Sequence, residues 1–227
     1  MERHFEQELE KLNRRILKMG DLVSNQVNNA MTALIRCDAQ LAREVVENDA
    51  RLDELDIKID KLCQRIFALT QPVATDLRMI MSALKINNDL ERMGDLAVNI
   101  ASKIEGIAEY HKIMTELNIE ELANMINSII KEMIIILNNR NTVFVKDIFA
   151  DARSIRERTQ IINTQIIDHM MKKTDVIIVA TNLIIILTHI ERLADYVTNI
   201  AESIVFLVDG KLIKHANIRE SDLTENP

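Results

Sequence analysis

A segment of fourteen residues near the middle of the chain recurs 100 positions further along. Seven residues of 91–104 are identical in 191–204, where chance would give about one match. A duplicated core would account for repeated Ile and Ala, but acidic residues also recur, which indicates that a polar site is duplicated as well. The recurring polar residues are Glu91, Arg92, Asp95 and Asn99, which return as Glu191, Arg192, Asp195 and Asn199.

The residues that interrupt helices are scarce throughout the chain. Its 227 residues include only 4 Gly and 2 Pro, whereas 48% of the residues are hydrophobic. Apolar residues recur at spacings of three and four, which is typical of amphipathic helices. The sequence therefore predicts an all-α fold of six long helices, at about Glu2–Ile35, Ala39–Leu69, Pro72–Tyr110, Ile119–Leu137, Thr142–Met171 and 174–209.

The six helices divide into two sets of three joined by short loops, and short loops make neighbouring helices antiparallel. We therefore expect two tandem, sequence-related three-helix bundles. The first would cover residues 1–115 and the second 116–212, followed by a polar tail at 213–227. The repeated acidic motif lies on the third helix of each bundle.

Charge and composition narrow the class of protein. The formal net charge of −7 and the aromatic content of 3% argue against a nucleic-acid-binding protein, which needs basic patches or stacking platforms. The first residues lack the apolar stretch of a signal peptide, and the two cysteines have no metal-binding or redox spacing. The apolar run 176–187 is shorter than a bilayer span. We expect a cytoplasmic protein that meets a membrane only through partners.

The duplicated motif places two carboxylates on one helix stripe. Glu91 and Asp95 are four residues apart, and so are Glu191 and Asp195, a spacing that stacks side chains along one face. A rotation of about 200° for two residues turns the pair away from Met93 and the core. An acidic surface of this kind is commonly just a solvated face, but two copies in register favour a metal site.

A further acidic pair precedes the first motif. Asp49 and Asp53 are also four residues apart, and antiparallel packing would bring them towards Glu91 and Asp95. Carboxylate oxygens suit hard or borderline cations, and a cation would relieve the repulsion between them. The five histidines show no metal-binding spacing, and no nucleotide-binding or nucleophile motif is present.

The acidic pairs, the segment 71–78 and the segments 89–95 and 190–195 together resemble the PhoU family, accessory proteins of phosphate-specific transport. The resemblance covers nearly the whole chain. It implies two three-helix bundles that bind metal ions, of which Mg, Mn, Fe or Zn are the candidates. The implied ligands are Asp49, Asp53, Glu91 and Asp95 in the first half, and Asp151, Glu191 and Asp195 in the second. Asp49-Ala50-Arg51 recurs as Asp151-Ala152-Arg153, which aligns Asp53 with Ile155 and predicts a weaker second site.

The resemblance also implies a function that no spacing shows. Such a protein would be a non-enzymatic negative regulator of the phosphate-starvation response and of phosphate uptake. Its partners would be a PhoR-like sensor histidine kinase and the PstB-like ATPase of a phosphate ABC transporter, and a homodimer is expected. Two alternatives remain open: a metal-dependent helical phosphohydrolase, and a purely structural helical protein with solvated acidic stripes.

Overall fold

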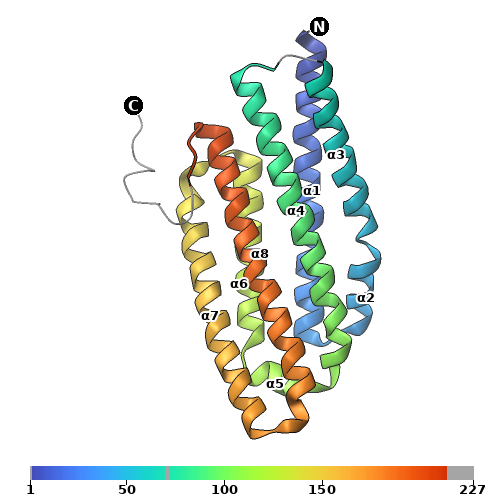
Figure 1. The fold of residues 1–227 in the computed structure, drawn as a ribbon, viewed down its shortest axis with the longest axis vertical. Coiled ribbons are helices and arrows are strands. Elements are labelled where there is room, and N and C mark those ends of the chain that lie inside the picture. The colour runs from blue at the N-terminus through green and yellow to red at the C-terminus, as the bar shows by residue number, and fades with distance from the viewer. Residues whose placement is uncertain (1, 70–71, 214–227) are drawn as a thin grey trace.

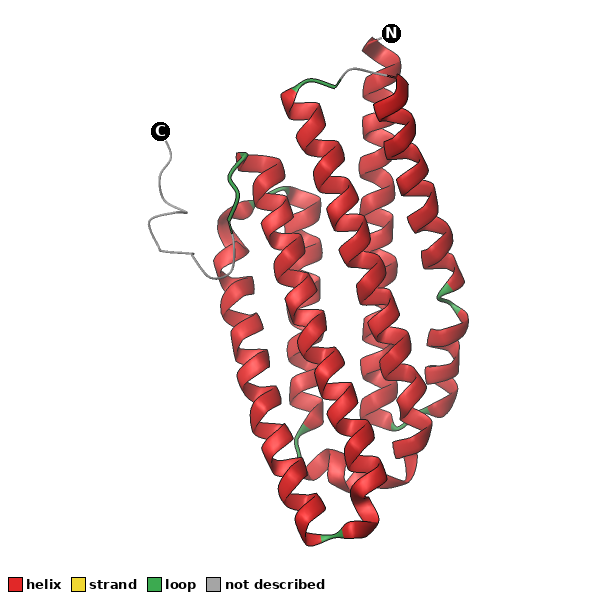
Figure 2. Cartoon of the chain, viewed as in Figure 1, coloured by secondary structure: helices red, strands yellow, loops and turns green. Residues whose placement is uncertain are grey.

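The computed structural model describes residues 2–69 and 72–213, with the side chains of 2–4 and 108–113 left out of the description (Figure 1). Within these residues every regular element is a helix, which confirms the all-α prediction (Figure 2). The elements are α1 (Glu2–Arg36), α2 (Ala39–Glu47), α3 (Ala50–Leu69), α4 (Ala74–Ile104), η1 (Glu105–Tyr110), α5 (His111–Glu116), α6 (Ile119–Asn139), η2 (Thr142–Phe144), α7 (Val145–Lys172), η3 (Thr174–Val176) and α8 (Ile177–Asp209). Most of the predicted tail, 214–227, lies outside the described residues.

The long helices run side by side along the long axis of the molecule (Figure 1). In the first half α1, α4 and the α2–α3 pair contact one another, and in the second half α6, α7 and α8 do the same. The halves meet where α4 packs on α8 and α1 packs on α6. Their buried side chains form one hydrophobic cluster that crosses this contact, so α4 and α8 are central helices.

The helix expected at Ala39–Leu69 is interrupted at Asn48 and Asp49. The Asn48 side-chain amide donates to the Glu44 carbonyl oxygen at 2.7 Å, and its backbone N–H bonds to the same oxygen. Asn side chains compete with helical backbone bonds in this way. Asp49 therefore lies within the break, at the junction of α2 and α3.

The connection between the halves also differs from the sequence expectation. α4 ends at Ile104 rather than near Tyr110, and the chain continues as η1 and α5 before α6 begins. Gly106 lies so close to α8 that a Cβ atom there would be 2.8 Å from Nδ2 of Asn182. The predicted end of α8 is confirmed, because Gly210 caps it with a positive φ of 69°, a conformation that glycine adopts freely.

The apolar character of the last long helix extends further than the run 176–187. By length and composition alone, residues 174–209 could cross a membrane. The same segment packs against α4, α6 and α7, and its apolar residues from Val179 to Val205 supply a large part of the core. Such packing is what a central core helix requires, so the apolar composition by itself is weak evidence for a membrane span.

The two cysteines are unpaired. Cys63 is fully buried on α3, where desolvation by burial raises the pKa of its thiol to about 12. Cys37 follows α1 and is only partly buried. Only Cys63 is therefore a core residue.

Candidate functional site

The first half carries a ladder of carboxylates where α4 lies against the α2–α3 pair. Asp49 stands at the α2–α3 junction, and its Oδ1 would lie 3.9 Å from a Cβ atom placed on Gly94. Gly94 directly precedes Asp95 on α4, and its lack of a side chain lets the two helices approach closely. The close approach brings the predicted acidic pairs of the two helices to the same side of the bundle.

Asp49 lies among groups that change the pKa of its carboxyl. The pKa of Asp49 is raised by desolvation and by the charges of Asp53 and Asp95, although a hydrogen bond from Gln26 opposes the rise. That bond is donated by Gln26 Nε2 to Asp49 Oδ1 at 3.0 Å. The charge of Asp95 on α4 thus acts on Asp49 across the helix contact, and Asp95 also raises the pKa of Glu91 on the same helix.

Two further carboxylates, Asp56 and Asp60, extend this ladder and were not among the residues predicted from the sequence. Asp56 and Asp60 of α3 share a hydrogen-bond donor, since Asn87 Nδ2 lies 2.6 Å from Asp56 Oδ1 and 3.3 Å from Asp60 Oδ1. Asn87 is fully buried. The charge of Asp56 also raises the pKa of Glu91. Their spacing from Asp53, three and seven residues, was the signal that could have identified them as part of the same helix face.

Glu91 and Asp95 are less exposed than the sequence geometry suggested. Their side chains are 25% and 41% exposed, because they lie at the margin of the α4 face that packs on α3. Desolvation is the largest cause of the raised pKa of Glu91, and the charge of Asp95 adds to it. Arg92, from the same helix, approaches both carboxylates at 3.4–3.5 Å.

The second acidic pair has a different neighbour. Arg156 of α7 places its guanidinium 2.6 Å from Asp195 Oδ1 and 3.4 Å from Glu191 Oε1. One cation from the neighbouring helix thus contacts both carboxylates of the duplicated motif.

The third predicted ligand of the second half does not join this pair. Asp151 is exposed on α7 and lies about 140° around the helix axis from Arg156, at 3.6 residues per turn. It shares the flank of Arg158, which pairs with Glu121 of α6 at 2.8 Å. The helix therefore directs Asp151 towards α6 and not towards Glu191 and Asp195.

Ile155, which the Asp-Ala-Arg alignment matched to Asp53, is a core residue with no exposed surface. The buried positions of α7 follow those of α3 at an offset of 100 and not 102. This register pairs Leu52, Leu55, Leu62 and Ile66 with Ala152, Ile155, Ile162 and Ile166. The alignment of Asp49 with Asp151 is therefore wrong by two residues, and the counterparts of Asp53 and Asp56 are Arg153 and Arg156.

The two halves differ in how well they fit a metal ion. The first half offers carboxylate oxygens that repel one another, the chemistry that a hard or borderline cation relieves. Among the residues that the structure describes, no three His, Cys, Asp or Glu side chains are already close enough to hold a metal ion. In the first half the nearby guanidinium, Arg92, belongs to the same helix and lies 3.4–3.5 Å from the two carboxylates. In the second half Arg156 comes from the neighbouring helix and approaches Asp195 to 2.6 Å.

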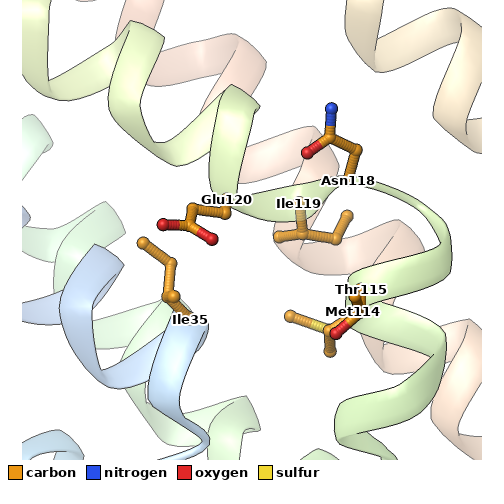
Figure 3. Close-up of a pocket in the computed structure, with 6 residues that line it drawn as sticks. All are labelled: Ile35, Met114, Thr115, Asn118, Ile119 and Glu120. Carbon is orange, nitrogen blue, oxygen red and sulfur yellow. The ribbon is translucent and has the colours of Figure 1, made fainter.

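A separate hollow lies at the end of the molecule where α1 meets the α5–α6 junction (Figure 3). Ile35, Met114 and Ile119 provide its apolar side, and Glu120 is the charged group that lines it. The duplicated acidic residues do not line this hollow, and we assign it no chemistry.

The helices and the acidic pairs define a class: all-helical proteins with a duplicated bundle and an acidic face on the third long helix of a half. The sequence matches the PhoU domain over residues 16–104 and again over 119–204, and the chain belongs to the PhoU family. It is 32% identical to the "phosphate-specific transport system accessory protein PhoU homolog" of Aquifex aeolicus, over 94% of this chain and 96% of that protein. It is 34% identical to the Rhizobium meliloti homolog, over 91% of this chain and 87% of that protein.

Solved structures agree with this assignment. The crystal structure of PhoU from Pseudomonas aeruginosa is similar with a TM-score of 0.85 and 30% identity, covering 91% of this chain and all of that one. The phosphate transport system regulatory protein PhoU from Streptococcus pneumoniae is similar with a TM-score of 0.81 and 27% identity, covering 92% and 99% of the two chains.

Proposed function

We propose that this protein is a non-enzymatic accessory regulator of phosphate transport that represses phosphate uptake and the phosphate-starvation response when phosphate is plentiful. The observation that carries the proposal is the match of both halves to the PhoU domain, in a chain that aligns with relatives over nearly their whole length. Those relatives are named as accessory or regulatory proteins of phosphate transport.

The proposed mode of action is that of a cytoplasmic adaptor. It binds the PstB-like ATPase of a phosphate ABC transporter on one side and a PhoR-like sensor histidine kinase on the other, and it forms a homodimer. An acidic helix face supports this role, because charged exposed surfaces steer association and fix its specificity. Co-purification with the ATPase and the kinase at high and low phosphate tests the partners, and light scattering tests the dimer.

We further propose that the carboxylate ladder of the first half binds a metal ion. Asp49, Asp53, Glu91 and Asp95 would supply oxygen ligands, with Asp56 nearby, and Mg, Mn, Fe or Zn are the candidate ions. A bound cation would neutralise the ladder and fix α3 against α4. Metal analysis of the purified protein tests this part of the proposal.

A reporter of the phosphate-starvation genes tests the regulatory function. Deletion of the gene should switch the reporter on in phosphate-rich medium, and a reporter that stays silent contradicts the proposal. A phosphatase assay on the metal-loaded protein distinguishes the adaptor from the alternative, a metal-dependent phosphohydrolase. Turnover that disappears in Glu91→Gln/Asp95→Asn would favour the enzyme.

A further inference from the structure

We propose that Arg156 forms ion pairs with Glu191 and Asp195, and that the second half therefore binds no metal ion at this acidic pair. The inference rests on the metal binding proposed above for the first half. It makes the duplicated protein functionally asymmetric, with a metal-binding first half and a metal-independent second half.

The first argument is the contact itself. Arg156 Nη2 lies 2.6 Å from Asp195 Oδ1, and its Nε lies 3.4 Å from Glu191 Oε1. A guanidinium presents donors in a rigid planar fork and remains charged at any ordinary pH. A metal ion at this pair would have to displace the guanidinium from both carboxylates, and the positive charge would still remain on the adjacent turn of α7.

The second argument is the register of the repeat. At the offset of 100 set by the buried residues, Asp53 and Asp56 of α3 correspond to Arg153 and Arg156 of α7. Arg153 and Arg156 are three residues apart and share a helix flank. The flank that supplies carboxylates in the first half therefore supplies cations in the second.

The third argument is that the remaining ladder positions of α7 carry no acidic residue and that the predicted ligand Asp151 lies elsewhere. Asp151 lies on the flank that faces α6, where Arg158 pairs with Glu121. The remaining positions that correspond to the first-half ladder are Phe149 and Gln160, the counterparts of Asp49 and Asp60. Glu191 and Asp195 thus contact Arg156 across the helix contact, and no position of α7 that corresponds to the ladder is acidic.

The test is a Mn²⁺ titration of the full-length protein after removal of bound metal, followed by calorimetry. Glu191→Gln/Asp195→Asn should leave Mn²⁺ binding unchanged, whereas Glu91→Gln/Asp95→Asn should abolish it. Arg153→Asp/Arg156→Asp gives the second half the counterparts of Asp53 and Asp56. It should bind about one further Mn²⁺ ion per chain, since carboxylates are preferred ligands of this ion. Adding Glu191→Gln/Asp195→Asn to that variant should remove the gain.

Lys131→Asp/Lys146→Asp is the matched control, because it makes the same change of charge at exposed positions of the same half. It should add no Mn²⁺ site, and circular dichroism should show that both double variants remain helical. Mn²⁺ binding in the unaltered protein that Glu191→Gln/Asp195→Asn removes would overturn the inference, and so would the absence of any gain in Arg153→Asp/Arg156→Asp. A protein that binds no Mn²⁺ in its first half contradicts the proposed metal function instead, while the gain still decides the role of the arginines.

Discussion

Asp89 of α4 is a carboxylate that the fold makes harder to ionise. Desolvation by burial raises its pKa to about 6, with Glu202 adding to the rise and Lys85 opposing it. The folded protein therefore holds this proton more tightly than the unfolded chain does. The contribution of Asp89 to the free energy of unfolding falls as pH rises from about 4 to about 6, and the full cost is present above that range.

Asp89→Asn should consequently stabilise the protein at pH 7 by about 1 kcal/mol, with little effect at pH 4. Thermal unfolding at the two pH values measures this. Asp168→Asn, at an exposed position of α7, is the control for the change of charge and should have no such pH dependence. An equal effect of Asp89→Asn at both pH values would contradict the assignment.

Glu91 should change its contribution to stability when metal is present. Its pKa is raised by burial and by the charge of Asp95, so Glu91→Gln removes a repulsion in the metal-free protein and should raise Tm. With Mn²⁺ at about one hundred times its Kd, the unaltered protein gains about 2.7 kcal/mol, and the variant should gain much less.

Differential scanning calorimetry measures the Tm of Glu91→Gln and of the unaltered protein, once with chelator and once with Mn²⁺. The variant should have the higher Tm with chelator and the smaller gain with Mn²⁺. Glu191→Gln serves as the comparison, because Glu191 pairs with Arg156 of the neighbouring helix in the half for which no metal ion is proposed. Its effect should be the same in the two conditions. A loss of stability in Glu91→Gln that does not depend on Mn²⁺ would contradict the metal role of this carboxylate.

At the scale of elements, the close approach of α3 and α4 depends on a large residue on α3, Leu52, packing against a small residue on α4, Gly94. A Cβ atom on Gly94 would lie 2.9 Å from Cδ1 of Leu52, so the large Leu52 requires the small Gly94. At the offset of 100, the second half has Ala152 and Ala194, both buried. The same helix contact is thus filled by a large and a small residue in the first half and by two alanines in the second.

This pairing predicts a compensating double variant. Leu52→Ala should lower the free energy of unfolding by about 2–5 kcal/mol, because it leaves a cavity in the core. Adding Gly94→Ala should recover part of this loss, since the new methyl group occupies some of the cavity and Ala favours the helix by about 0.5–1 kcal/mol. Urea unfolding of the single and double variants measures the coupling, and a double variant less stable than Leu52→Ala would refute the explanation.

The elements also show what sequence reasoning could establish. The spacing of apolar residues located the long helices, and the repeat located Glu91 with Asp95 and Glu191 with Asp195. The helix break at Asn48 and Asp49 could not be predicted, because neither Gly nor Pro marks it. The tripeptide Asp-Ala-Arg, shared by 49–51 and 151–153, suggests an offset of 102, whereas the buried residues give 100, with Ile155 in the core.

At the scale of the whole molecule, the halves are not independent. The α4–α8 and α1–α6 contacts join them through one continuous hydrophobic cluster. Removing either half would expose the apolar surface of α4 or α8 to water. We therefore expect guanidinium unfolding, followed by circular dichroism, and thermal unfolding, followed by calorimetry, each to show a single transition. Two separated transitions would contradict a shared core.

The asymmetry between the halves leads to the most direct test of the functional account. A strain without the gene is complemented with the unaltered protein, with Glu91→Gln/Asp95→Asn, or with Glu191→Gln/Asp195→Asn, and a phosphate-starvation reporter is measured in phosphate-rich medium. The account predicts that the unaltered protein and the second-half variant restore repression, whereas the first-half variant fails although it is folded and present in equal amount. Full repression by Glu91→Gln/Asp95→Asn would contradict the central claim, that the carboxylate ladder of the first half supports regulation of phosphate transport.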